Sequence, residues 1–211
     1  HFTSEIKPLK LQKYQRENIE DCIIKFFNVN RYRPKNNMSL KKISVVSIFP
    51  ISKSPIRTLS ANLVDSIIKY LEFKRYTVDL VLDNNSVISE IFMKNLRSQS
   101  VNVINPKNIA DLNNYIRSIE CGIFCDSGPL HLSKIYLKKG LLISTSVDSK
   151  KILSNQDKIV YYNSEYKSTY CMAPCGLTNI INFKNQHGCY DTLKKTKSYI
   201  MKNSKTNLLN R

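Results

Sequence analysis

The feature that most constrains the fold is an alternation of short β-branched runs with longer segments of helical spacing, which begins at Ile43. The run from Ile43 to Phe49 reads as a buried strand. From Leu59 to Lys74, apolar residues then recur every three or four positions, which predicts an amphipathic helix. Repeated units of this kind are typical of βαβ crossovers. The sequence therefore predicts an α/β fold, a doubly wound parallel sheet.

The same alternation continues through the middle of the chain. Further strands are expected at 77–82, 101–104, 121–125, 141–144 and 159–162, and further helices at 87–96, 109–116 and 129–138. The expected strand order is 3-2-1-4-5-6, which makes the first and fourth strands neighbours. An amphipathic helix is expected within 14–27, and a last helix is expected to begin near Asp191. We divide the chain into an N-terminal helix and connector at 1–42, a main domain at 43–195, and a helix end and tail at 196–211.

Length and hydropathy favour one folded core outside the membrane. A chain of 211 residues can bury one principal core. Its longest apolar runs fall short of the ~20 residues that a membrane-spanning helix needs. The chain opens at His1 without a charged and apolar leader. We therefore expect a cytoplasmic protein, of which this sequence is a piece.

The net charge of +17 has two readings. A positive field attracts nucleic acid, acidic lipid or phosphorylated ligands. A bias in nucleotide composition that favours lysine, asparagine and isoleucine would produce the same excess without any partner. The basic residues are spread along the chain and form no arginine and aromatic block, so we expect no nucleic-acid partner.

The most informative junction between a strand and a helix is the run from Cys125 to Leu132, which reads Cys-Asp-Ser-Gly-Pro-Leu-His-Leu. Ligands of an open parallel sheet bind outside the carboxyl ends of its strands. The following helix presents unsatisfied N–H groups there, and Gly128 allows a close backbone approach to phosphate. The alternative is that Asp126 and Ser127 only cap the helix and that His131 is an ordinary polar residue.

This junction resembles the Asp-Ser/Thr-Gly-x-x-His-Leu signature of the lipopolysaccharide heptosyltransferases, glycosyltransferase family 9. Pro106 and Lys107, which lead into the predicted third helix, are similar to the family's approach to the signature. Downstream, the spacing of Cys171, Pro174, Cys175, His187 and Cys189 resembles the Cys-x-Pro-Cys and His-x-x-Cys pattern of many members. The resemblance covers roughly Lys42 to Lys195.

The resemblance implies the Rossmann-like, C-terminal, donor-binding half of a GT-B glycosyltransferase. Such an enzyme transfers a sugar from a nucleotide-sugar of the ADP-heptose type to a lipid-linked saccharide, such as a lipopolysaccharide core, by inverting displacement. It needs no further cofactor. The signature residues would hold the donor diphosphate: Asp126, Ser127, Gly128, Pro129 and His131. The family's catalytic base belongs to an N-terminal domain missing here, so we expect this chain alone to be inactive and assign it no catalytic residue.

Three further donor contacts are expected from the resemblance. Arg57 best matches the basic phosphate contact in the loop after the first strand, and Lys53 matches it second. A guanidinium can grip phosphate oxygens through two hydrogen bonds. The alternative is a solvated base at a helix start. Glu90 matches an acidic position that contacts donor hydroxyls, although a surface charge on a helix would read the same way.

The cysteine cluster at Cys171, Cys175 and Cys189, together with His187, allows three states. These are a zinc site, a disulfide and reduced thiols. Because the spacing matches no standard zinc pattern and the chain is not cysteine-dense, we expect structural thiols and no metal.

A second class of function stays open, namely a non-catalytic module that binds nucleotide or polyanion through its charge. Such a module would bind weakly and with a steep dependence on salt. Peripheral contact of the lysine excess with anionic membrane is expected if the acceptor is a lipid-linked saccharide. No Gly-x-Gly-x-x-Gly run and no Gly-Lys-Ser/Thr run occurs, which argues against a classical dehydrogenase and a P-loop NTPase.

Overall fold

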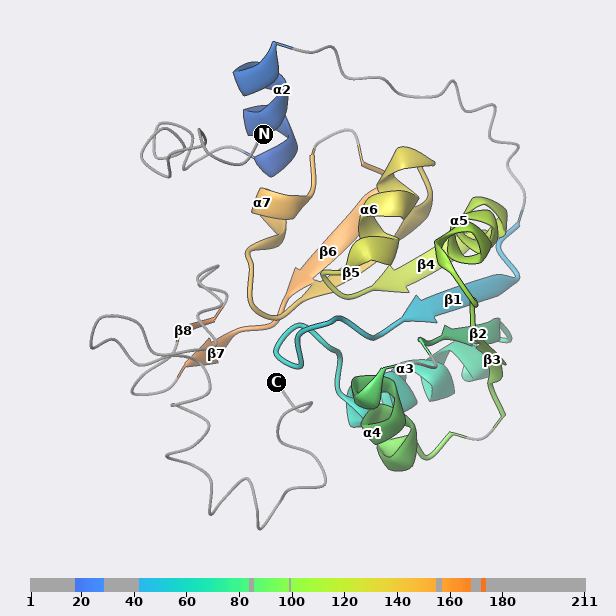
Figure 1. Ribbon diagram of the computed structural model, residues 1–211. Helices are drawn as coiled ribbons and strands as arrows, with labels where there is room; N and C mark the ends of the chain where they lie inside the picture. Colours follow the sequence, from blue (N-terminus) through green and yellow to red (C-terminus); the bar gives the residue numbers. More distant parts are fainter. Residues whose placement is uncertain are drawn as a thin grey trace.

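The computed structural model describes residues 18–28, 42–83, 86–98, 100–154, 157–167 and 172–173. Its centre is a six-stranded sheet with the order β3-β2-β1-β4-β5-β6, in which every pairing is parallel (Figure 1). The strands are β1 (Val45–Phe49), β2 (Thr77–Val81), β3 (Asn102–Ile104), β4 (Cys121–Phe124), β5 (Lys139–Ser144) and β6 (Ile159–Asn163). The predicted doubly wound parallel sheet and its strand order are therefore confirmed.

Helices form a layer on each face of this sheet. They are α2 (Ile19–Phe27), α3 (Ala61–Phe73), α4 (Val87–Asn95), α5 (Ile109–Ser118), α6 (Gly128–Ile135) and α7 (Ser149–Ile152). Figure 1 shows α3 and α4 on one side and α5, α6 and α7 on the other, with α2 beside α7. A short antiparallel pair, β7 (Tyr166–Lys167) and β8 (Met172–Ala173), follows the sheet.

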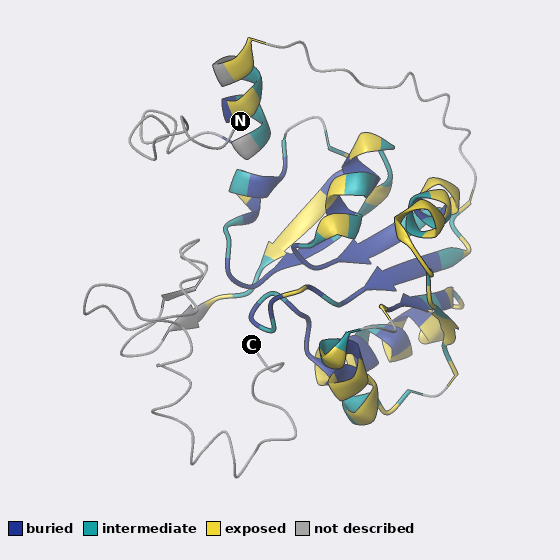
Figure 2. Ribbon diagram, in the orientation of Figure 1, coloured by how far each residue is buried: buried dark blue, intermediate teal, exposed yellow. Residues whose placement is uncertain are grey.

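Both faces of the sheet are buried at its centre. One core lies between the sheet and the layer of α3 and α4, and includes Ile48, Leu80 and Phe92. The other lies under α5 and α6, where the rings of Phe49 and Phe124 stack with centroids 5.0 Å apart. Figure 2 shows buried central strands and an exposed edge at β6. This burial on two faces explains why the strands read as nearly continuous apolar runs.

The ends of several elements differ from the predicted ends. The first strand begins at Val45 rather than Ile43, where Glu120 accepts hydrogen bonds from the amides of Ser44 and Val45. The helix α6 ends at Ile135 instead of continuing to Lys138, because Leu137 adopts a left-handed conformation with φ of 50°. Neither the hydrogen bonds to Glu120 nor the left-handed conformation of Leu137 could be predicted from the local sequence.

Several predictions fall outside the described residues. These include the last helix near Asp191 and the state of Cys171, Cys175, His187 and Cys189. Within the described residues, no helix is long and apolar enough to cross a membrane. No group of metal-ligating side chains occurs in the same part of the chain. The division of the chain at residues 42 and 195 stays a prediction.

Candidate functional site

A cavity of about 610 Å³ opens at the carboxyl ends of the first four strands. This is the edge at which parallel α/β sheets bind ligands. The lining residues come from the last residues of β1 and β2, the loops after β1, β2, β3 and β4, and the first turns of α5 and α6: Phe49, Ile51, Ser52, Lys53, Arg57, Val81, Leu82, Asp83, Ser86, Pro106, Lys107, Asn108, Ile109, Leu112, Asp126, Ser127, Gly128, Pro129 and His131. The cavity straddles β1 and β4, where the strand order reverses.

The loop after β1 presents Arg57 from a fixed backbone. The hydroxyl of buried Thr58 accepts a hydrogen bond from the amide of Ser52 at 3.1 Å and donates to the carbonyl of Ser54 at 3.1 Å. From the loop after β5, the hydroxyl of Thr145 donates to the carbonyl of Ile56 at 2.6 Å. Because the loop is hydrogen-bonded within itself and to the loop after β5, the Arg57 side chain leaves from a defined position.

Asp126 forms the centre of the charged part of the cavity. Arg57 Nη1 donates to its Oδ2 at 3.4 Å, and His131 Nε2 lies 3.8 Å from its Oδ1. The side chain of Asp126 is 10% exposed and that of Arg57 is 34% exposed. Two basic groups, one from the loop after β1 and one from the first turn of α6, therefore lie around one largely buried carboxylate.

Burial and charge set the protonation of this part of the site. The pKa of His131 is lowered, first by burial and then by the charge of Lys134, and Asp126 opposes the shift. The imidazole is therefore neutral at neutral pH and can donate through one N–H. Burial raises the pKa of the Cys125 thiol to about 12, so this cysteine stays protonated and is a poor nucleophile.

The N-terminus of α6 faces the same cavity. Gly128 and Pro129 open this helix and line the cavity, and Ser127 is its N-cap. The Ser127 side chain makes no capping hydrogen bond and instead donates to the carbonyl of Cys125 at 3.4 Å. The sequence left open whether Ser127 only caps the helix; in the structure its hydroxyl does not do so. A helix start with its positive dipole end beside Arg57 favours an anion.

The part of the cavity lined from β2, β3 and α5 combines apolar and polar side chains. Its apolar members are buried Val81 and Leu82 at the end of β2, with half-buried Leu112 and exposed Ile109 of α5. Its polar members are Asp83, Ser86, Lys107 and Asn108.

The sequence motif around Pro106 and Lys107 drew attention to the loop after β3, but nothing in it identified the loop as a wall of the cavity. Charged groups and an apolar surface within one cavity suit an amphiphilic ligand such as a nucleotide.

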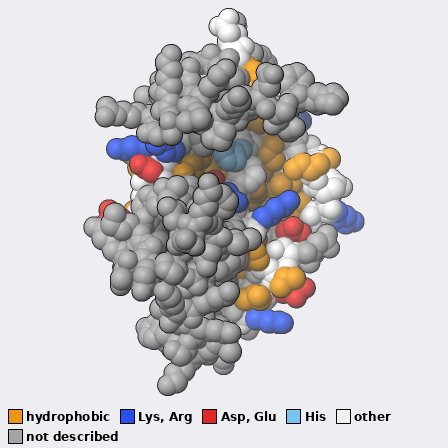
Figure 3. Space-filling model, turned by 60° about the vertical axis from the view of Figure 1, so that its left-hand side comes forward, with side chains coloured by type: hydrophobic (Ala, Val, Ile, Leu, Met, Phe, Trp, Pro, Cys, Tyr) orange, Lys and Arg blue, Asp and Glu red, His pale blue; other side chains and the backbone are white. Residues whose placement is uncertain are grey.

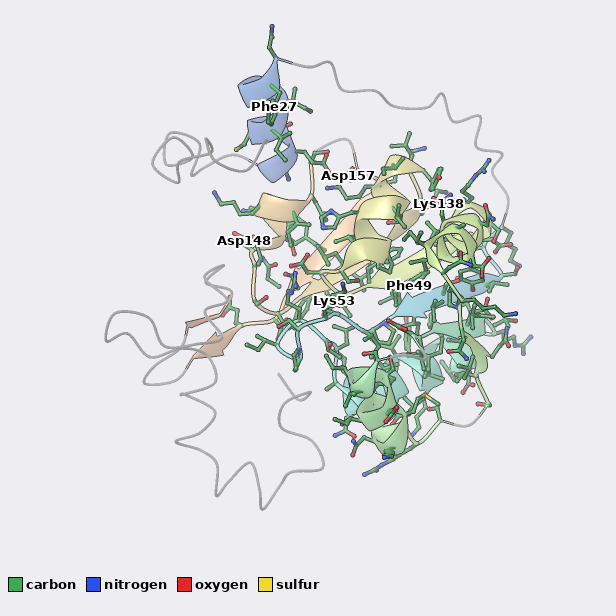
Figure 4. The ribbon with its side chains drawn as sticks, viewed as in Figure 1. Phe27, Phe49, Lys53, Lys138, Asp148 and Asp157 are labelled. Atoms are coloured by element: carbon green, nitrogen blue, oxygen red, sulfur yellow. The ribbon has the colours of Figure 1, made fainter. Side chains whose placement is uncertain are left out.

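The structure brings together all but one of the residues expected at the donor site. Asp126, Ser127, Gly128, Pro129, His131, Arg57 and Lys53 all line the cavity. Glu90 does not line it, but lies exposed in the first turn of α4, where the surface-charge reading fits better. Figure 4 shows Lys53 in the loop beyond Phe49 at the end of β1. Figure 3 shows basic side chains near a histidine and hydrophobic side chains on one face.

No known family model and no curated protein sequence matches the chain. Several solved structures resemble it. A glycosyltransferase of family 9 from Veillonella parvula aligns with a TM-score of 0.51 and 12% identity over 76% of this chain and 46% of that one. E. coli heptosyltransferase WaaC with ADP aligns with a TM-score of 0.48 and 11% identity over 79% of this chain and 46% of that one. E. coli ADP-heptose lipopolysaccharide heptosyltransferase II aligns with a TM-score of 0.45 and 10% identity, covering 88% of this chain and 52% of that one.

The chain thus spans about half the length of the solved structures that it resembles. The likeness to the Veillonella parvula structure, with a TM-score of 0.51, agrees with the all-parallel sheet and the helix layers described above. The chain therefore shares its Rossmann-like fold with about half of a family 9 glycosyltransferase.

Proposed function

We propose that this chain is the donor-binding, C-terminal half of a GT-B glycosyltransferase, and that it binds a nucleotide-sugar of the ADP-heptose type. The observation that carries the proposal is the convergence of Arg57, His131 and the start of α6 on one cavity. The fold shared with a family 9 glycosyltransferase supports it.

The charged end of the cavity is the proposed place of the diphosphate. Arg57 supplies positive charge, the Gly128 amide at the start of α6 supplies an N–H donor, and His131 supplies a further donor. Pro129 has no N–H, and the Leu130 amide already donates to the carbonyl of Ser127. Asp126 is unsuited to direct contact with phosphate, because a carboxylate and a diphosphate repel each other. Its hydrogen bond with Arg57 supports a different role, in which it orients the guanidinium toward the ligand.

The wall from β2, β3 and α5 is the proposed place of the nucleoside. A base ring can pack against aliphatic side chains such as Val81, Leu82 and Leu112. Lys107 and Asn108, just before α5, line the same cavity and are the proposed polar partners. Lys53, exposed at the rim, is the proposed second phosphate contact.

We propose that transfer itself needs a second half of the enzyme, since this chain spans about half the length of the solved structures that it resembles. We propose that an N-terminal domain supplies the base that deprotonates the acceptor, and that transfer proceeds by inverting displacement. The isolated chain would then bind donor without transferring its sugar. The proposed acceptor is a lipid-linked saccharide such as a lipopolysaccharide core. Peripheral contact with anionic membrane from the cytoplasmic side belongs to the same proposal.

Titration calorimetry with ADP tests the donor site. We expect saturable binding that Arg57→Ala weakens at least tenfold, on the scale of about 1.4 kcal/mol for one charge-assisted hydrogen bond. Lys69→Ala is the matched control, since it removes one positive charge from the exposed face of α3, away from the cavity. Equal losses in the two variants would contradict the proposal.

Salt dependence separates this proposal from a polyanion-binding module. A built diphosphate site should keep most of its affinity between low and moderate salt, because it makes few ionic contacts. A diffuse lysine field should bind heparin, nucleic acid and ADP alike and lose them all steeply with salt. Similar affinity for every polyanion would favour the module.

A further inference from the structure

The side chain of Lys134 on α6 is enclosed by groups from three other parts of the fold. Its Nζ forms an ion pair with Glu20 of α2 and lies 3.5 Å from Asp157 Oδ2, just before β6. It also donates a hydrogen bond to the carbonyl of Ile152 in α7. The Lys134 side chain is only 4% exposed and that of Asp157 only 1% exposed. Figure 4 shows Asp157 between α2 and α6.

Stability alone does not account for a buried charge of this kind. A buried ion pair contributes little net stability compared with a well-packed apolar side chain, because both charges lose their water. What such a group does well is to fix one arrangement of the elements that it joins. The side-chain amide of Asn18, at the start of α2, also donates to the carbonyl of Leu153, so α2 is anchored twice at the same place.

This buried cluster adjoins the anion site through α6 itself. Lys134 follows His131 by three positions, which places the two side chains one turn apart on the same side of the helix. Four charged groups act on the imidazole: Lys134 and Arg57 favour its neutral form, whereas Asp126 and Glu20 favour its charged form and raise its pKa. A carboxylate of α2 thereby influences a residue that lines the cavity.

We propose that Glu20 and Lys134 form a positioning pair through which helix α2 holds α6, and with it His131, in place for anion binding. Neither residue lines the cavity, so both act through α6. The inference rests on the proposed function, because it assumes that the anion is the diphosphate of a nucleotide. It adds a dependence of that site on a helix that precedes the whole sheet in sequence.

The test uses the full chain with Glu20→Gln, which removes the negative charge of Glu20 and leaves Lys134 paired with Asp157. The matched control is Asp21→Asn, which removes the same charge from the same turn of α2 without taking a partner from Lys134. A third variant, Glu20→Asp, keeps the charge. All three are compared by ADP calorimetry at about pH 6.5, near the ordinary pKa of histidine.

We expect Glu20→Gln to weaken ADP binding by about two- to fivefold, the scale of one charge acting near a helix end. Asp21→Asn should bind like the wild type, and Glu20→Asp should recover much of the loss. An NMR titration of the His131 imidazole, assigned with His131→Gln, should show a lower pKa in Glu20→Gln only. A variant that binds less ADP because its fold is destabilised would instead show a lower thermal unfolding midpoint, which is measured for each variant.

If wild-type chain binds ADP, the affinities decide. Equal affinity of Glu20→Gln and Asp21→Asn overturns the positioning pair and leaves the donor site intact. If the wild type binds no ADP, the proposed function fails, and the His131 titration decides separately. An imidazole pKa that is the same in Glu20→Gln and Asp21→Asn then overturns the pair, whereas a fall confined to Glu20→Gln supports it.

Discussion

Arg57, in the loop after β1, and His131, in the helix after the neighbouring strand β4, approach different oxygens of one carboxylate, that of Asp126. The guanidinium lies 3.4 Å from Oδ2 and the imidazole 3.8 Å from Oδ1. The sequence predicted that these two residues would meet at one anion site. In the structure they meet around Asp126, which leaves both of them on the wall of the same cavity.

Removing Arg57 or His131 should weaken ADP binding by about 1 to 3 kcal/mol each, the scale of a charge-assisted hydrogen bond. Because both would contact one diphosphate, the loss of binding free energy in the double variant Arg57→Ala/His131→Gln should be smaller than the sum of the losses in the two single variants. Calorimetry of the four proteins measures the coupling. Fully additive losses would show that the two residues serve separate sites.

Asp126→Asn should weaken ADP binding through Arg57, because it removes the carboxylate that orients the guanidinium. The effect should shrink when Arg57 is already alanine, since no guanidinium is left to orient and only His131 still lies beside Asp126. A loss of the same size in the Arg57→Ala background would instead show that Asp126 does not act through Arg57. The same calorimetric measurement compares both backgrounds.

The affinity for ADP should rise as the pH falls through the pKa of His131. In the free protein burial lowers this pKa below its ordinary value, so the imidazole is neutral at pH 7. A bound anion favours the protonated form, and binding therefore takes up a proton and strengthens at lower pH. The phosphate of ADP titrates in the same range, so His131→Gln is the control. A pH profile that is identical in that variant would exclude His131 as the titrating group.

Gly128→Ala should reduce ADP binding without reducing stability. A Cβ at this position meets no protein atom within 4 Å, and Gly128 lines the cavity, so the added methyl competes with the ligand rather than with the fold. We expect a loss of about fivefold, near the 1 kcal/mol of one hydrogen bond. Unchanged ADP affinity would show that the ligand stays away from the start of α6.

Gly140→Ala, unlike Gly128→Ala, should reduce stability, because the added methyl group would collide with the neighbouring strand. Its Cβ would lie 2.3 Å from the carbonyl oxygen of Gly122 on the neighbouring strand β4 and 2.9 Å from the Phe124 ring. We expect a loss of about 1 to 3 kcal/mol of unfolding free energy, measured with urea, as for other overpacked sites. A folded, fully stable variant would mean that β4 and β5 can separate more easily than their pairing indicates.

The sheet could be predicted from sequence because its central strands are buried on both faces, which leaves runs of β-branched and aromatic residues. The start of β5 shows the limit. Lys139 and Gly140 are poor strand formers, so the strand was expected from Leu141, but they pair in register with Cys121 and Gly122 of β4. Pairing with a distant strand overrides local propensity and leaves no local signal.

The site was predictable to the extent that its residues follow strands. Seven of the expected donor contacts line the cavity because carboxyl ends of parallel strands meet at one edge. Glu90 was placed by resemblance alone and lies elsewhere. The burial of Lys134 could not be predicted, because a lysine in a helix is ordinarily exposed to solvent. No local sequence pattern indicates that Glu20 and Asp157 lie around its ammonium group.

The hydrogen bond from Thr145 to the carbonyl of Ile56 joins residues 89 positions apart. On the ribosome the loop that carries Arg57 emerges well before the hydroxyl that anchors it, because chains are synthesised from the N-terminus. A nascent chain that ends before β5 contains Asp126 but lacks this anchor, so it can hold Arg57 only through the contacts within its loop and through that carboxylate. The loop of the proposed donor site is therefore fully anchored only late in translation, after Thr145 has left the exit tunnel.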